Sequence, residues 1–530
     1  MSYSLQRISS IPQEYEDEEG EIEKEISLEK ALELSPKLRE FANKCPELME
    51  YAKKIVGLPA TFSSHAAGLI ISDVPIVEFA PVRIDKKGTM AIQHEKHRTE
   101  ECQLVKIDFL GLSTLDILDE ILKSIKKLNL PGIPETIDDI PLDDKETYKM
   151  IQEGRTKCVF QFGKSTMMQG LCKRFKPENI EDLAIINALG RPSSSNEERS
   201  ECLGRRLGKK EIAYEHLSLK NSLSGTVGLC IYEEQLMGVA KDVAGWDLNK
   251  ADGLRKLTKY KGKEPALAEK LMNEFIEGAM KVHNITCDEA KNIWMKVVDK
   301  FQGYGFNKSH SVAYSINGYY TAYLKCHYPA AFFAAYLNVK TNSSSQIRDE
   351  EIAIAKAECR KMGVSIISPD INKSGMGYEV IDEKTIAMGM MSLKGMGDKA
   401  VEDIFANQPF TSFLDFIYRT DNRVVNKSKI EALAKAGCFD SMGLSRKAIF
   451  EEGKKIKEKL AAFIKKKEKD HQDITMALEE FPVSLSKEDW SKKEKLMYEQ
   501  EVLGELVSGT ITDMYPGFFS KLTPPFGGLS

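Results

Sequence analysis

The chain has 530 residues, 42% hydrophobic and 29% charged, a balance typical of a folded protein of three or four domains. Its formal net charge of −5 excludes nucleic-acid binding through overall charge, so such a surface would have to be a local basic patch. Ten cysteines without Cys-x-x-Cys spacing argue against a zinc ribbon and a disulfide scaffold. The start lacks a signal-peptide core, and no uncharged apolar run is long enough to span a membrane. We therefore expect a cytoplasmic protein without membrane contact.

The first part of the chain predicts helices followed by strands. An acidic stretch at 13–30 precedes helical spacing of apolar residues over 28–56. β-branched residues interrupted by prolines predict strands within 65–84, and a further short strand is expected within 102–112. This part should therefore carry the small β component of the fold.

The remainder of the chain is dominated by helical patterns. A helix is expected at 114–127, and 143–340 should be mostly helical with loops at 190–210 and 258–265. A polar linker at 341–347 precedes a compact helical unit over 350–445 with one strand pair near 378–391. A lysine-rich helix is expected over 451–470, and the tail from 515 should be a loop. The predicted fold class is α+β, predominantly helical.

The sharpest local signal is VKIDFLGL at 105–112. Side chains alternate between the faces of a strand, so Lys106 and Asp108 share one face while Ile107 and Phe109 share the other. An aspartate and a lysine at a turn can bind a metal and a phosphate, and Asp is a hard oxygen ligand suited to Mg²⁺. By local chemistry alone, a surface ion pair on a half-buried strand is the commoner interpretation.

A second signal is KFQGYGFNKSHS at 300–311. Two glycines flank Tyr304 and allow the backbone to approach a ligand closely, and an aromatic ring there suits a stacked base. A helix starting near Ser311 would direct its N-terminus at an anion. A glycine turn before a serine-capped helix fits equally well. The donors of this segment are Asn307, Lys308, Ser309 and His310.

Two basic clusters stand out in this acidic chain. One has Tyr260 among its cations, and the other occupies 205–210. Phosphate binding needs such clusters, although a solvated helix face is the commoner interpretation. The clusters contain Arg255, Lys256, Lys259, Lys261 and Lys263, and Arg205, Arg206, Lys209 and Lys210.

The segment LKGMGD at 393–398 is typical of a helix-hairpin-helix. Backbone N–H groups around Lys394, Gly395 and Gly397 would contact DNA phosphates without reading sequence. Any tight turn between two helices could show the same pattern. Glu234, Gln235 and Arg191 are polar residues in apolar settings, and each alone is more typical of a structural residue than of a ligand.

Taken together and in order, these segments resemble the bacterial DNA polymerase III alpha family, of the DnaE type. The likeness runs from about residue 6 to about 510, and the set is highly specific. The segments that carry it include RISSIP (7–12), SSHAAGLIISD (63–73), VKIDFLGL (105–112), CVFQFGKSTMMQGL (158–171), IYEEQLMGVA (231–240), KFQGYGFNKSHSVAYS (300–315) and LKGMGDKAVEDI (393–404).

The resemblance implies a domain map. Residues 1–62 would be the end of the thumb and 63–113 the second palm segment. Residues 114–340 would form the fingers and 341–445 the helix-hairpin-helix or little-finger region. Residues 446–530 would be the clamp-binding region and a truncated tail, with a sliding clamp as partner. The pentapeptide at 472–476 lies where a clamp-binding sequence is expected but matches it poorly.

The resemblance also implies site residues. Three palm aspartates of the family hold two Mg²⁺ ions, and Asp108 takes the place of the third, with Lys106 facing the nucleotide or primer end. Primed DNA template and dNTPs are then the substrates. Nucleotide-binding roles fall to Arg191, Arg255, Lys256, Tyr304, Asn307, Lys308, Ser309 and His310. DNA-binding roles fall to Arg205, Arg206, Lys259, Lys261, Lys394, Gly395 and Gly397.

Several departures from the family pattern matter. No Pro-Asp-x-Asp occurs before residue 63, so the motif that carries two of the family's catalytic carboxylates is not in this sequence. A counterpart of the family's amino-terminal phosphoesterase-like domain is not in it either. A Gly-Arg-Pro-Ser-Ser-Ser run (190–195) replaces a rigid glycine–proline turn, which affects Arg191. Where relatives have a second arginine, this chain has Lys256, which keeps the positive charge but lacks the planar guanidinium group.

These observations lead to a functional hypothesis. The chain would be part of a replicative DNA polymerase that is inactive alone and needs an upstream fragment carrying the two-aspartate motif. It would act in a bacterial cell or a phage-infected one. The alternatives are a fragment of one longer gene, a non-catalytic DNA-binding or clamp-associated factor, and a purely structural helical scaffold.

Overall fold

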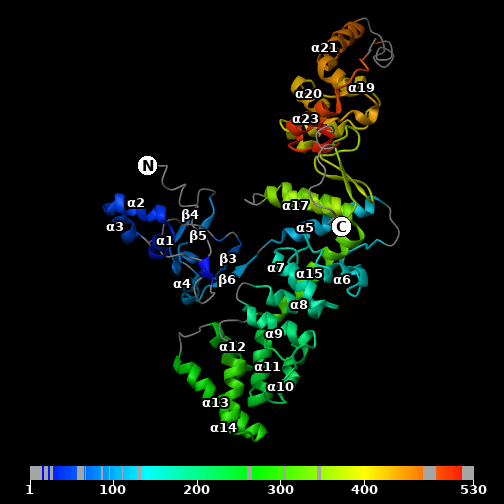
Figure 1. Cartoon of the computed structure of the whole chain (residues 1–530). Coiled ribbons are helices and arrows are strands. Elements are labelled where there is room, and N and C mark those ends of the chain that lie inside the picture. The colour runs from blue at the N-terminus through cyan, green and yellow to red at the C-terminus, as the bar shows by residue number, and fades with distance from the viewer. Residues whose placement is uncertain are drawn as a thin grey trace. The chain divides into compact units, whose positions relative to one another are not determined.

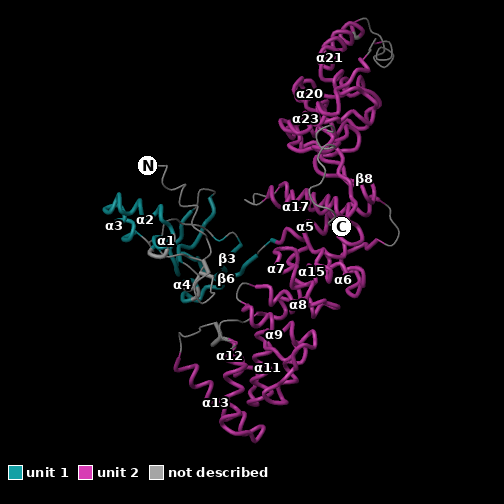
Figure 2. Tube along the Cα trace, viewed as in Figure 1, with its two compact units in different colours: residues 1–111 teal, residues 112–530 magenta. Residues whose placement is uncertain are grey.

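The computed structural model describes residues 15–16, 22–23, 28–55, 65, 67–84, 88–94, 96–109, 111–128, 133–191, 194–259, 265–299, 301, 306–342, 348–469, 481 and 485–515. The chain divides into two compact units, Met1–Gly111 and Leu112–Ser530 (Figure 2). The predominantly helical α+β fold is confirmed, since long helices alternate with a few short strands (Figure 1). Within the described residues, no helix is both apolar enough and long enough to cross a membrane.

The first unit contains three short consecutive helices. They are α1 (Leu28–Leu34), α2 (Pro36–Lys44) and α3 (Pro46–Ile55). The sequence predicted one helical region over 28–56, but prolines at the first position of α2 and α3 divide it. Ser35 caps α2 by accepting a hydrogen bond from the Leu38 amide at 3.3 Å.

The strands of the first unit form two-stranded sheets. One sheet joins β3 (Gly68–Ile71) to β6 (Val105–Asp108) antiparallel, with Gly68 opposite Asp108 and Leu69 opposite Ile107. The strands predicted within 65–84 and 102–112 are confirmed. The other described elements are β1 (Tyr15–Glu16), β2 (Ile22–Glu23), η2 (Ile76–Glu78), β4 (Val82–Ile84), β5 (Met90–Ile92) and α4 (Lys96–Glu101).

The second unit has three hydrophobic cores. The first includes Phe162, Tyr319 and Phe332, and it lies among helices that are distant in sequence. It is formed by α5 (Ser113–Lys127), α6 (Lys145–Gln152), α7 (Thr166–Phe175), α8 (Ile180–Leu189), α15 (Lys308–His327), α16 (Pro329–Thr341), α17 (Arg348–Lys361) and a three-stranded sheet of β7 (Ser365–Ile367), β9 (Thr385–Ala387) and β8 (Glu379–Asp382).

A second core is built around Phe275 and Trp294, whose rings meet edge to face at 5.3 Å between centroids. The elements around the second core are α10 (Leu219–Leu223), η4 (Ser224–Thr226), α11 (Glu233–Ala244), α12 (Leu248–Lys259), α13 (Pro265–His283), α14 (Cys287–Ile293) and the π-helix η5 (Trp294–Asp299).

The prediction of a loop over 190–210 is wrong, because residues 196–206 form the helix α9. Ser195 and Glu198 make a capping box that starts this helix within a polar sequence. The helix α9 (Asn196–Arg206) packs against the first core through Cys202 and Leu203.

The third core is centred on Phe413, Phe416 and Phe439. The predicted lysine-rich helix is confirmed and begins earlier than expected, at Arg446. The elements of this part are η6 (Met390–Ser392), α18 (Asp398–Ala406), α19 (Phe413–Arg419), α20 (Lys427–Ala436), η7 (Asp440–Met442), α21 (Arg446–Lys469), α23 (Lys492–Leu503) and α24 (Ile511–Met514). The predicted tail loop lies largely outside the described residues.

Candidate functional site

The polar face of the β3–β6 sheet gathers three polar side chains. Lys106 Nζ donates to both oxygens of Asp108 at 2.6 and 2.8 Å. His65 Nδ1 lies 3.7 Å from Asp108 Oδ1. Asp108 is about half exposed, with a side-chain exposure of 52%, so its carboxylate remains accessible to a ligand.

Gly68 makes room for this group. A Cβ at Gly68 would come within 3.0 Å of both His65 Nδ1 and Lys106 Cε, and within 3.2 Å of Asp108 Oδ1. Sequence reasoning missed His65 and Gly68. The signal that could have found Gly68 is the antiparallel register, which places it directly opposite Asp108.

The Asp108 carboxylate is chemically suited to be one ligand of a metal ion. A half-exposed carboxylate is a suitable oxygen donor for Mg²⁺. Across the described part of the chain, however, no group of three or more His, Cys, Asp or Glu side chains is placed to hold a metal ion. Asp108 can therefore contribute to a magnesium site but does not complete one with its described neighbours.

A second cluster lies where α8 ends and α15 begins. The Arg191 guanidinium lies over the Phe306 ring at 3.8 Å from the centroid, and its Nη2 is 3.5 Å from His310 Nε2. The His310 ring in turn contacts Tyr314, with 4.1 Å between centroids. Burial, and secondly the charge of Arg191, lower the pKa of His310, so its imidazole is neutral at neutral pH.

The start of α15 is fixed by hydrogen bonds. Asn307 caps the helix by accepting from the His310 amide at 2.8 Å. Glu234, at the start of α11, accepts from Asn307 Nδ2 at 2.9 Å and from the Lys308 amide at 2.9 and 3.1 Å. Lys308 and Ser309 are exposed beside this anchor. Sequence reasoning considered Glu234 but did not connect it with α15.

Arg255 joins the same neighbourhood through Glu233. Its Nε lies 2.7 Å from Asp252 Oδ1 and its Nη1 3.5 Å from Glu233 Oε2. The hydrogen bond to Asp252 raises the pKa of Arg255. The Glu233 amide donates to the Phe306 carbonyl at 3.0 Å, next to Arg191. The structure thus brings together Arg191, Arg255, Asn307, Lys308, Ser309 and His310.

Other predicted residues are not brought into this cluster. Arg205 donates to Glu201, at 2.9 Å, and to the carbonyls of Val227 and Gly228, both at 3.1 Å. Arg206 donates to Asp182 at 2.8 Å. Both guanidinium groups are thereby engaged within the fold. Tyr304, Lys261 and the side chains of Lys256 and Lys259 lie outside the described residues, as does the predicted clamp-binding pentapeptide.

The predicted hairpin joins η6 to α18. Lys394, Gly395 and Gly397 are exposed, and Gly395 has φ +80°, a conformation that favours glycine. Lys429 Nζ donates to the Gly395 carbonyl, and the Lys394 amide donates to the Val502 carbonyl at 2.8 Å. The turn is therefore anchored from two sides while its glycines face solvent.

Comparison with protein families matches three segments of the chain. Residues 1–111 match the bacterial DNA polymerase III alpha NTPase domain. Residues 114–283 match the bacterial DNA polymerase III alpha subunit finger domain, and 363–449 match a helix-hairpin-helix motif. The last match agrees with the hairpin expected at 393–398.

The relatives to which the chain is similar are DNA polymerase III alpha subunits. The chain is 34% identical to that of Aquifex aeolicus over 502 residues, which is 93% of this chain and 41% of the relative. The subunit of Borreliella burgdorferi is 36% identical over 88% of this chain and 40% of its own length. That of Escherichia coli is 34% identical over 92% and 43%. The chain spans about two-fifths of the length of these relatives. It belongs to the bacterial DNA polymerase III alpha family.

Proposed function

We propose that this chain is part of a DNA-directed replicative DNA polymerase and supplies one of its catalytic carboxylates. The observation that carries the proposal is the accessible Asp108 carboxylate, held by Lys106 on the polar face of a strand in the segment matched to the polymerase family. The reaction would be template-directed transfer of a nucleotide from a dNTP to a primer 3′-OH.

Asp108 would hold Mg²⁺ together with two carboxylates from another polypeptide. Bound Mg²⁺ would favour ionisation of the primer 3′-OH and offset the negative charge that builds on the transferred phosphoryl group. Lys106 would keep the Asp108 carboxylate oriented and add positive charge beside the phosphates. Because one carboxylate does not hold two metal ions, we expect the isolated chain to be inactive.

The cluster at the start of α15 would bind the incoming nucleotide. Arg191, Arg255 and Lys308 offer positive charge to a triphosphate. The exposed Ser309 hydroxyl donates to Asn307 Oδ1 at 2.6 Å and would have to turn from it to donate to a phosphate. Neutral His310 can donate or accept a hydrogen bond without adding charge. The exposed turn at Gly395 and Gly397 would contact the phosphates of the primed template.

The surface of the β3–β6 sheet supports a second chain as partner. Leu69, Ile71 and Val105 lie on the apolar face and are 56%, 51% and 58% exposed. Within the described residues this sheet has two strands, a number that is at best marginally stable in isolation. A polypeptide carrying the two-aspartate motif could cover this face, and its two carboxylates would join Asp108 on the opposite, polar face of the sheet.

A second candidate function is a non-catalytic DNA-binding or clamp-associated factor. It is favoured by the fact that the described residues do not complete a metal site. Primer extension with Mg²⁺ separates the two, using this chain alone and then mixed with the upstream polypeptide that carries the two-aspartate motif. Extension by the mixture only supports the split polymerase. Primed-DNA binding without extension in any mixture supports the non-catalytic factor.

A further inference from the structure

A stripe of exposed lysines runs along α21. Residues 454–469 contain eight lysines and two glutamates, although the whole chain has a net charge of −5. Lys455, Lys459, Lys466 and Lys469 are separated by four, seven and three residues. At about 100° per residue around a helix, these spacings place the four lysines within an arc of about 80°. They span about 21 Å at a rise of 1.5 Å per residue. The lysine stripe consists of Lys455, Lys459, Lys466 and Lys469, all exposed.

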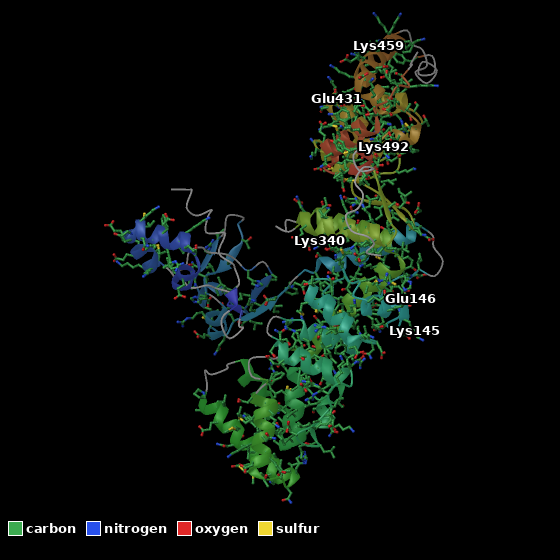
Figure 3. All side chains as sticks on the ribbon, in the orientation of Figure 1. Lys145, Glu146, Lys340, Glu431, Lys459 and Lys492 are labelled. Carbon is green, nitrogen blue, oxygen red and sulfur yellow. The ribbon has the colours of Figure 1, made fainter. Side chains whose placement is uncertain are left out.

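The opposite face of α21 is fixed to the protein. Leu460 is 1% exposed and Ile456 9% in the third core. Lys457 Nζ donates to the Val425 carbonyl at 2.8 Å. The rotation of the helix about its axis is therefore set, and the lysine stripe is presented to solvent (Figure 3 labels Lys459).

The lysine stripe is not neutralised by the residues that the structure describes. No ion pair from its four members occurs among them, whereas Lys454 on the flank lies 3.3 Å from Glu458. Other surface helices of the chain pair their lysines with an acid four residues earlier, as Lys44 pairs with Glu40 and Lys123 with Asp119. Like charges four residues apart, such as Lys455 and Lys459, destabilise a helix. A polyanionic ligand would relieve this repulsion.

We propose that the lysine stripe of α21 binds the sugar–phosphate backbone of duplex nucleic acid without reading its sequence. The stripe contains no arginine fork and no aromatic ring, and Ala462 lies at its middle. Protein interfaces are depleted in lysine and depend on aromatic and arginine anchors, so a lysine-only surface fits phosphates better than an acidic protein. Binding of single strands needs stacking on aromatic rings, and Phe463 beside the stripe is half-buried.

The dimensions are consistent with a duplex. One strand carries a phosphate about every 3.4 Å along the axis, so about 21 Å of helix can face about six phosphates. Each flexible lysine can neutralise one of them. The lysine stripe would thus add a contact to duplex DNA that needs neither a primer end nor a nucleotide.

Anisotropy of a labelled, blunt 20-base-pair duplex tests the proposal. The full chain is used in a salt titration without Mg²⁺, dNTP or a partner polypeptide. We expect Lys455→Gln/Lys459→Gln/Lys466→Gln/Lys469→Gln to reduce the slope of log affinity against log salt by about 3–4, at about 0.9 per phosphate contact. Affinity at 0.1 M salt should fall at least tenfold. The corresponding Lys→Arg quadruple variant should retain binding, and circular dichroism should show unchanged helix content in both.

The control removes the same charge elsewhere: Lys126→Gln/Lys127→Gln/Lys145→Gln/Lys149→Gln changes exposed lysines of α5 and α6. An equal loss in this control would overturn the assignment to α21. Unchanged duplex binding by the stripe variant would overturn the proposal. If that variant also lost binding of a polyglutamate peptide, the lysine stripe would be assigned to an acidic protein partner. An equal loss for a single-stranded oligonucleotide would overturn the duplex assignment. None of these outcomes depends on polymerase activity.

Discussion

Lys106 Nζ donates hydrogen bonds to both carboxylate oxygens of Asp108, at 2.6 and 2.8 Å. The lysine side chain is 18% exposed while that of the aspartate is 52% exposed, so the cation approaches from the protein side and the carboxylate faces solvent. The ammonium group and a metal ion would share the oxygens of one carboxylate. The position of Lys106 should therefore govern how Asp108 is presented to Mg²⁺.

Lys106→Met should lower the extension rate of the reconstituted polymerase by about a hundredfold, because it removes a preorganised donor and positive charge beside the phosphates. Some activity should remain, since the metal-binding oxygens of Asp108 are unchanged. Steady-state primer extension measures this effect, with Lys126→Met as control. Equal rates for Lys106→Met and the unmodified chain would exclude Lys106 from the site.

Glu234→Ala should raise the KM for dNTP by about tenfold, the equivalent of about 1.4 kcal/mol. The reason is the loss of the acceptor for Asn307 Nδ2 and the Lys308 amide, which hold the start of α15. Glu234→Gln keeps one acceptor oxygen and should recover part of the affinity. Titration of dNTP in primer extension gives the KM, and Glu269→Ala on α13 is the matched control. A loss in kcat with an unchanged KM would argue against a role in nucleotide binding.

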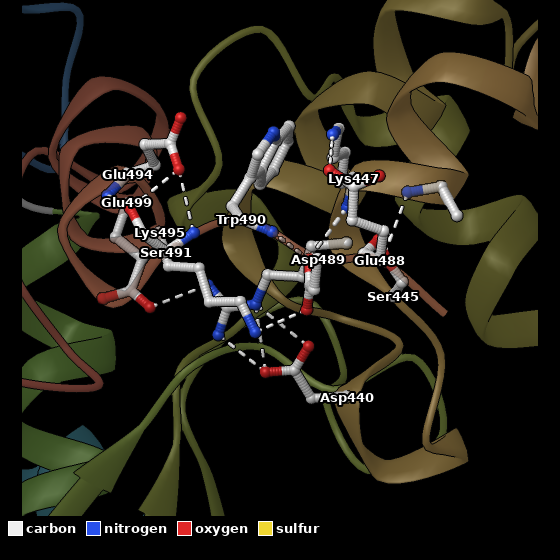
Figure 4. Close-up of polar contacts among 12 residues, drawn as sticks. Asp440, Ser445, Lys447, Glu488, Asp489, Trp490, Ser491, Glu494, Lys495 and Glu499 are labelled. Atoms are coloured by element: carbon white, nitrogen blue, oxygen red, sulfur yellow. Dashed lines mark hydrogen bonds and ion pairs between the residues drawn. The ribbon is translucent and has the colours of Figure 1, made fainter. Parts of the chain in front are cut away.

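Glu499→Leu should reduce the unfolding free energy of the third core by about 3 kcal/mol, because it leaves a buried guanidinium with one partner fewer. Glu499, labelled in Figure 4, is fully buried and lies 2.9 Å from Arg446 Nη1. Its other oxygen accepts hydrogen bonds from the amides of Val507 and Ser508. Hydrogen exchange of α23 in denaturant measures the loss.

The control for this variant is Glu488→Leu, which removes a carboxylate of the same network that is 74% exposed. Exposed pairs contribute little to stability, so its effect should be clearly smaller. Equal effects of the two substitutions would show that burial of the Arg446–Glu499 pair does not stabilise this core.

Because Lys457 is buried, we expect the free energy of unfolding to depend on pH. Burial lowers the pKa of Lys457 from 10.5 to about 8. Between these values the unfolded chain holds a proton that the folded chain has lost, so the stability that this residue confers rises with pH. Relative to Lys457→Met, the unfolding free energy should rise by about 2–3 kcal/mol between pH 7 and 10.5. Denaturant unfolding at several pH values measures this difference. A difference that does not change with pH would contradict the prediction.

The fold was predictable where the sequence is periodic. Alternation across 105–108 identified β6 and the shared face of Lys106 and Asp108, and helical spacing identified α5 and α21. The helix α9 was missed because a polar, serine-rich start was interpreted as a loop, although Ser195 and Glu198 carry the capping-box spacing. Local sequence signals were therefore enough to predict the helices and strands, provided that capping residues were considered.

Long-range partners were not predictable from spacing. Glu234 contacts Asn307 across 73 positions, and Arg206 contacts Asp182 across 24. The first contact adds a residue to the cluster proposed to bind the nucleotide, whereas the second engages an arginine that the sequence suggested for DNA binding. Neither pairing leaves a periodic pattern, because packing of distant helices determines it.

The most direct test of the central claim is primer extension by the reconstituted polymerase carrying Asp108→Ala, with primed-DNA binding measured on the same sample. Asp73→Ala, also in the first unit, is the control. We predict that Asp108→Ala abolishes extension while DNA binding is retained and the control remains active. Extension at an undiminished rate by Asp108→Ala would show that Asp108 is not a catalytic carboxylate of this polymerase.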